Sequence, residues 1–142
     1  MKMNVHLNFA GNCKEAFSFY EKALNSKVVM SLTYSEAPGG SPVPPNWSDK
    51  VMHTSIPLGS GLLMGCDAPA GQSKPIGGFQ VSVESEDEAE VKRIFDTLKE
   101  GGSVQMPMMP TFWSPMFGMC TDKFGVAWMV GMPAKEQMQA AR

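Results

Sequence analysis

The fold of this chain is decided by residues 111–130, TFWSPMFGMCTDKFGVAWMV. Apolar runs at 116–120 and 126–130 predict two short strands. Between them, Gly125 can adopt a positive φ angle and Asp122 can hydrogen-bond its own backbone, as is typical of a tight turn. We therefore predict a β-hairpin here and work outward from it.

The residues before this hairpin predict a strand, a helix and a further strand. Phe79, Val81 and Val83 alternate with Gln80 and Ser82, which predicts a half-buried strand. Ser85 and Glu88 have the spacing of a capping box. Helical spacing then follows at Val91, Ile94, Phe95 and Leu98, with the helix ending near Gly101 and Gly102, and residues 103–108 predict a strand.

The first half of the chain follows the same plan. Val5, Leu7 and Phe9 alternate with His6 and Asn8 in a predicted first strand. Asn12, with Glu15 as its reciprocal partner, is predicted to cap a helix over 13–24. A strand over 27–34, a Pro-rich loop over 35–50 and a hairpin made of 51–58 and 62–67 complete this half. Two such copies predict an internal repeat, with strand and helix offset by about 74 residues and the hairpin turns by about 64.

These motifs resemble one known family. The D-K-F-G-V-A-W-M run at 122–129, the T-F-W at 111–113, the segment FAGNCKEAF at 9–17 and the pair Met52-His53 are similar to the PhnB-like branch of the glyoxalase/bleomycin-resistance/dioxygenase (vicinal oxygen chelate) superfamily. The resemblance implies a single α+β domain of two βαβββ modules, which form a cupped eight-stranded sheet with the helices outside. We place module 1 at about 1–67, a linker at 68–78, module 2 at about 79–131 and a tail at 132–142.

Composition and charge exclude several classes of partner. A net charge of −2, a pI near 5.6 and scattered Lys and Arg argue against nucleic acid. No apolar run reaches membrane-spanning length, and the N-terminus lacks a signal-peptide core, so we predict no membrane partner and a cytoplasmic protein. The three cysteines are an odd number at wide spacings, which fits a reducing compartment.

The resemblance also implies where a ligand would bind. In the family, polar strand faces look into the cup, which places His6, Asn8, Gln80 and Ser82 there, with His6 and Gln80 at equivalent positions of the two modules. His53 shares a strand face with Ser55, and is equally consistent with a pocket residue and with a structural histidine. Trp113 lies before the last hairpin, where an aromatic ring can close a pocket. The predicted ligand-binding residues are His6, Asn8, His53, Gln80, Ser82, Trp113 and Met129.

We predict no bound metal and no cofactor. Metal-dependent members of the family hold a divalent ion with His or Gln from the first strand of each module and a carboxylate from the last. The carboxylate positions, four residues after each turn glycine, hold Gly65 and Met129 here. His6 and Gln80 alone would supply two neutral ligands, which bind metal weakly.

Two functions are the main alternatives, and a scaffold that binds no ligand is a third. The first is a metal-free homodimer that binds a small, partly apolar molecule; the second is a metal-dependent lyase, isomerase or dioxygenase of the same superfamily. Segments 35–50 and 107–117 are expected at the dimer interface, with Trp47 exposed in the first of them. The helix dipole can activate the thiol of Cys13, in the first turn of its helix, but a passive thiol is the favoured interpretation. Cys66 and Cys120 are predicted to be inert and Trp128 to lie in the core.

Overall fold

The computed structural model describes residues 1–39, 43–69 and 74–135. It contains two compact units, Met1–Pro75 (unit 1) and Ile76–Arg142 (unit 2). The boundary falls inside the predicted linker 68–78. Residues 136–142 of the predicted tail lie outside the described residues.

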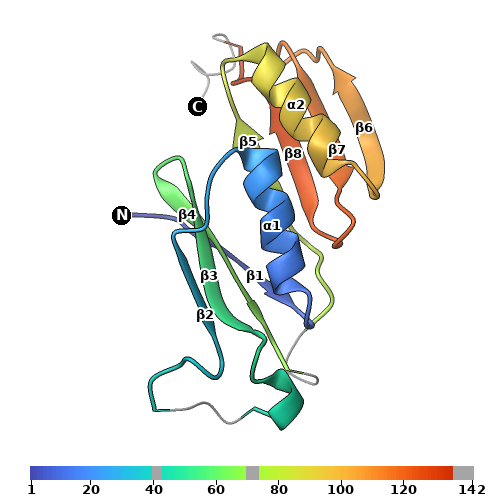
Figure 1. The fold of residues 1–142 in the computed structure, drawn as a ribbon. Helices are drawn as coiled ribbons and strands as arrows, with labels where there is room; N and C mark the ends of the chain where they lie inside the picture. Colours follow the sequence, from blue (N-terminus) through green and yellow to red (C-terminus); the bar gives the residue numbers. More distant parts are fainter. Residues whose placement is uncertain (40–42, 70–73, 136–142) are drawn as a thin grey trace. The chain divides into compact units, whose positions relative to one another are not determined.

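Unit 1 is a βαβββ module, shown in blue to green in Figure 1. Its elements are β1 (Val5–Phe9), α1 (Cys13–Leu24), β2 (Met30–Thr33), the 3-10 turn η1 (Pro45–Trp47), β3 (Val51–Leu58) and β4 (Gly61–Asp67). The strand order is β1-β4-β3-β2, with β1 parallel to β4 and the other pairs antiparallel.

Unit 2 repeats this topology. Its elements are β5 (Val81–Glu84), α2 (Glu88–Leu98), β6 (Ser103–Met109), β7 (Phe117–Thr121) and β8 (Ala127–Gly131), and its strand order is β5-β8-β7-β6. The hairpin predicted at 111–130 is β7–β8. The predicted α+β class with two βαβββ modules is confirmed.

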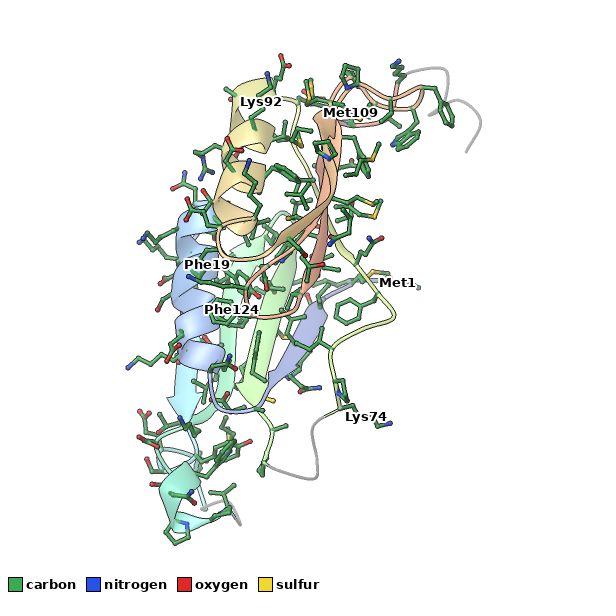
Figure 2. All side chains as sticks on the ribbon, turned by 90° about the vertical axis from the view of Figure 1, so that its right-hand side faces the viewer. Met1, Phe19, Lys74, Lys92, Met109 and Phe124 are labelled. Carbon is green, nitrogen blue, oxygen red and sulfur yellow. The ribbon has the colours of Figure 1, made fainter. Side chains whose placement is uncertain are left out.

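In each unit the helix packs on one face of its own sheet. Figure 2 shows α1 along one side of the strands of unit 1, and α2 along one side of the strands of unit 2. The sequence alternation explains this: Leu7 and Phe9 are buried on the α1 side while His6 and Asn8 are exposed. Trp128 fills the corresponding core of unit 2 and is fully buried, as predicted. We call the sheet face opposite the helix the open face.

Both predicted helix caps are wrong. The Asn12 side chain makes no cap hydrogen bond; instead the carboxylate of Asp67, at the end of β4, accepts hydrogen bonds from Gly11 N at 2.9 Å and Cys13 N at 3.0 Å. A buried charged acceptor from the sheet thus replaces a local cap. At α2 the cap is Asp87, which accepts from Ala89 N and Glu90 N, while Ser85 donates to Glu90 Oε2.

Candidate functional site

The open face of unit 1 carries both histidines of the chain. His6 on β1 and His53 on β3 are 6.0 Å apart between ring centroids, with 26° between the ring planes. The strand register explains the proximity, because His6 pairs with Met64 of β4 and Met64 pairs with Ser55 of β3. Two residues along β3, His53 therefore lies on the same face.

These two rings influence each other electrostatically. Partial burial, and to a lesser extent the neighbouring His53, lowers the pKa of His6. His6 is therefore neutral at pH 7 and offers one donor nitrogen and one acceptor nitrogen. A neutral imidazole of this kind can hydrogen-bond a ligand and can accept a proton from it.

Cys66 joins this group through two polar contacts. Its thiol donates to Asn8 Oδ1 at 3.2 Å, and its sulfur lies 3.4 Å from His6 Nε2. Burial and the charge of Asp67 raise the pKa of Cys66, so the thiol stays protonated. With the thiol hydrogen donated to Asn8, the hydrogen shared with the sulfur comes from His6 Nε2. The alternation of β4 gave the signal, because Leu62, Met64 and Cys66 fall on one face and Leu63, Gly65 and Asp67 on the other.

The open face of unit 2 is chemically simpler. Ser82 pairs with Met129, and Met129 pairs with Met119, so these three side chains form a row across the sheet. Gln80 precedes β5 and its amide donates to Met119 Sδ at 3.6 Å. The predicted residues Gln80, Ser82 and Met129 thus share a face made of an amide, a hydroxyl and thioethers. Whether His6 and Gln80 converge remains a prediction, because they belong to different units.

Trp113 lies in the β6–β7 connection within a small aromatic group. Its ring packs edge-on against Phe112 at 4.9 Å and Phe117 at 5.3 Å between centroids. Buried Ser114 anchors the connection by donating to the carbonyl oxygens of Met116 and Met132. Phe112 is 75% exposed, so the group keeps an apolar surface open to a ligand or a partner.

The donors within each unit do not fit the family's metal site. Leu7 pairs with Gly65 in unit 1, and its equivalent Val81 pairs with Trp128 in unit 2. The residue of unit 1 that is equivalent to Met129 is therefore Cys66. The sequence-based prediction that Gly65 is the equivalent of Met129 is wrong by one residue. Neither Cys66 nor Met129 is an oxygen ligand. Asp67 turns toward α1, where Gly11, Cys13 and Val51 N–H groups occupy its oxygens. Within the described ranges, no three His, Cys, Asp or Glu side chains lie close enough together to hold a metal ion.

Cys13 is a passive thiol, the interpretation that the sequence favoured, because burial and the nearby Asp67 carboxylate raise the pKa of its thiol and the side chain is fully buried. The prediction for Trp47 changes. Trp47 is half-buried rather than exposed, and its indole N–H is buried without a partner in the described part of the chain. No helix among the described residues is long and apolar enough to span a membrane.

The fold agrees with comparisons to known proteins. The model of the Glyoxalase/Bleomycin resistance protein/Dioxygenase superfamily matches residues 5–130, and the chain belongs to this superfamily. Protein YjdN of Escherichia coli (strain K12) is 30% identical over 98% of this chain and 100% of its own length.

Solved structures narrow the assignment. Protein PA1353 from Pseudomonas aeruginosa is 43% identical, with a TM-score of 0.82 over 94% of this chain and 98% of that one. The PhnB protein from Bacillus cereus is 26% identical, with a TM-score of 0.71 over 93% of this chain and 99% of that one. The resemblance to the PhnB-like branch is therefore confirmed.

Proposed function

We propose that the protein binds a small, partly apolar organic molecule on the open face of unit 1, without a catalytic metal. The observation that carries this proposal is the contact of His6 with both His53 and Cys66 on a face that also carries apolar side chains. Few polar groups at defined positions among apolar side chains are typical of small-molecule sites. Exposed Met30 and half-buried Met64 supply a deformable apolar surface beside them.

The hydrogen bonds on this face define what the ligand must offer. His6 Nε2 donates to Cys66, so its Nδ1 remains an acceptor. The side chains of His53 and Asn8 supply further polar atoms at fixed positions on the strands. A ligand that carries a hydroxyl or carbonyl group on an apolar frame would match these groups. On unit 2, we propose Gln80, Ser82, Trp113 and Met129 as ligand-binding residues.

The alternative is a metal-dependent enzyme of the same superfamily. The neutral His6 beside His53 favours it, because such an imidazole can act as a general base. Such an enzyme would need a set of metal ligands that the described residues of each unit do not supply. Metal analysis of protein purified without a chelator separates the two: stoichiometric Mn, Fe, Ni or Zn would favour the enzyme.

The Bacillus cereus relative is named as a putative 3-demethylubiquinone-9 3-methyltransferase. The present sequence does not support that activity, because no G-x-G-x-x-G follows a strand.

We further propose a cytoplasmic homodimer with no nucleic-acid or membrane partner. The exposed apolar side chains of Val104, Met109 and Phe112 in unit 2 support a partner surface, since exposed apolar side chains are typical of interaction sites. Residues 35–39, 43–50 and 107–117 are its expected contributors. Light scattering at micromolar concentration tests this, and a monomer would contradict it.

The two histidines make the ligand site directly observable. Because the chain has no others, the ring resonances of a tag-free sample report on this face alone. We expect saturable shifts of both rings when 8-anilinonaphthalene-1-sulfonate, an apolar probe, is titrated. Met30→Asp on this face should abolish them, whereas Val104→Asp in unit 2 should not; these side chains are similarly exposed, at 44% and 46%. Unmoved histidine resonances, or equal effects of both variants, would contradict the proposal.

A further inference from the structure

A cavity lies on the other side of the same sheet, between α1 and the β2–β3 edge of unit 1. Its volume is about 350 Å³, near the lower end of the range for small-ligand pockets. Phe17 of α1 and Val51 of β3 supply apolar lining, and both side chains are themselves buried. The open face and its histidines lie across the sheet, so this cavity is a separate feature.

The lining also contains a hydroxyl group, that of Thr54. Thr54 is only 2% exposed, and its pairing with Gly65 places it on the α1 side of the sheet. Thr54 thus places a hydroxyl group at the wall of the cavity, where it can donate a hydrogen bond to a ligand or accept one from it.

Carboxylates dominate the charged part of the lining. Glu21 Oε2 accepts from Val28 N at 2.8 Å, and Glu36 Oε1 accepts from Thr33 N and Thr33 Oγ1 at 3.1 and 2.7 Å. The hydrogen bonds from Thr33 lower the pKa of Glu36, which keeps it ionised at neutral pH. Each carboxylate is thus held in place through one oxygen, while the other oxygen takes no part in these bonds. Asp49 adds a third negative charge, and Lys14 is the cationic lining residue.

We propose that this cavity is a second ligand site, for a small organic cation such as a primary amine or a guanidine with a short apolar body. The positive head would hydrogen-bond the carboxylates of Glu21, Glu36 and Asp49, because charge-assisted bonds are the strong ones. The apolar body would lie against Phe17 and Val51, and Thr54 would bond a polar group at its inner end. Since the open-face ligand lies across the sheet, neither site depends on the other.

The test uses n-butylammonium and n-butylguanidinium as probes, with butanol and butyrate as the neutral and anionic controls. Backbone amide shifts in ¹⁵N-labelled full-length protein at low salt locate the site. We expect saturable shifts at Glu21, Glu36 and Thr54 with the two cations only, while the His6 and His53 ring resonances stay in place. Failure of the open-face proposal would leave this result unchanged.

Three substitutions decide whether the binding is specific. Glu36→Gln removes one charge from an exposed side chain and should weaken cation binding about tenfold or more. Glu15→Gln, an equal charge change on α1 outside the cavity, should leave it unchanged. Thr54→Val keeps the shape of the side chain and should weaken binding about fivefold. Equal weakening by the two Glu→Gln variants, equal binding of butanol, or absence of shifts at the lining residues would each overturn the proposal.

Discussion

The two units share a topology but use their buried aspartates differently. In unit 1, Asp67 accepts hydrogen bonds from Gly11 N, Cys13 N and Val51 N, which lie 56, 54 and 16 residues away in the chain. In unit 2, Asp122 accepts from Phe124 N, Val126 N and Trp128 Nε1, at most six residues away. The first carboxylate joins a helix start, a strand and a loop, whereas the second shapes one turn. A repeated fold therefore need not distribute its stabilising contacts equally.

The open faces differ in the same way. Unit 1 presents two imidazoles, a thiol and an amide there, and unit 2 presents an amide, a hydroxyl and thioethers. Titratable groups are concentrated where the proposed ligand binds. The two modules have similar sheet faces, but the imidazoles and the thiol occur only on the open face of unit 1.

The largest expected effect is that of removing the unit 1 carboxylate. Asp67→Ala leaves three backbone N–H groups without their charged acceptor, so we expect the free energy of unfolding to fall by about 3 kcal/mol or more. Chemical denaturation followed by circular dichroism measures it. A loss below about 1 kcal/mol would show that solvent replaces the carboxylate.

A matched pair of milder variants sharpens this comparison. Asp67→Asn and Asp122→Asn each remove one charge from a buried hydrogen-bonded side chain. Amide hydrogen exchange should accelerate across α1, β3 and β4 in the first variant, and only in the β7–β8 hairpin in the second. Equal spread in both would contradict the difference between a long-range and a local carboxylate.

The next largest effect is expected at a position where the two units fill their cores differently, with a helix side chain in unit 1 and a strand side chain in unit 2. Register makes Gly65 of β4 equivalent to Trp128 of β8. In unit 1 the helix supplies the bulk, because a Cβ at Gly65 would overlap the ring of Phe17. Gly65→Ala should therefore destabilise by about 1–3 kcal/mol, as overpacking does.

Gly77→Ala provides the control for this substitution. Nothing lies within 4 Å of a Cβ at Gly77, and its φ is not positive, so the unfolding free energy should change by less than about 0.5 kcal/mol. A similar loss in both glycine variants would indicate an effect on the unfolded chain rather than contact with Phe17.

Helix caps give a smaller effect that again separates the units. Asp87→Ala removes the cap of α2 and should cost about 1 kcal/mol. Asn12→Ala should cost nearly nothing, because Asp67 rather than Asn12 caps α1. Thermal unfolding of both variants measures the difference, and an equal loss would restore the cap that the sequence predicted.

These corrections show how far local sequence reasoning reaches. Strand alternation, helical spacing and turn residues predicted both α-helices and all eight strands of the described residues, because these signals are local. The 3-10 turn η1 falls inside the predicted loop 35–50 and was missed. The cap supplied by Asp67 could not be predicted in the same way, since its partners lie 54 and 56 residues away. The hydrogen bond of Asp122 to the backbone of its own turn was predicted correctly, because its partner Phe124 N lies only two residues away.

The candidate site was partly predictable. Alternation placed His6 and Asn8 opposite the helix, and the structure brings His53 beside His6. The contribution of Cys66 was missed, because its place next to Asn8 follows from the parallel register of β1 and β4. The cavity under α1 was missed as well, since it depends on the packing of a helix against an edge strand rather than on a motif.

The smallest expected effect tests the interaction of the two histidines. Burial is the larger cause of the lowered pKa of His6, and His53 is the smaller one. His53→Asn should therefore raise the pKa of His6, while leaving it below its usual value of about 6.5. The His6 Hε1 resonance, followed against pH in a chain with one remaining histidine, measures it directly. An unchanged pKa would show that the rings do not interact.

The same variant predicts a change in the pH dependence of stability. The folded protein binds a proton at His6 less tightly than the unfolded chain does. The contribution of His6 to the unfolding free energy is therefore fully present above about pH 6.5 and is lost as the pH falls through the lowered pKa. Raising the pKa of His6 brings its folded-state value closer to its unfolded-state value. In His53→Asn, His6 should therefore contribute less to the loss of stability at acidic pH. Denaturation between about pH 5 and 7.5 tests this, with His6→Asn as the reference that removes the His6 contribution altogether. If stability fell more steeply with decreasing pH in His53→Asn than in the unmodified chain, the predicted direction of the effect would be wrong. That result would refute the interaction of His53 with His6 on the open face of unit 1.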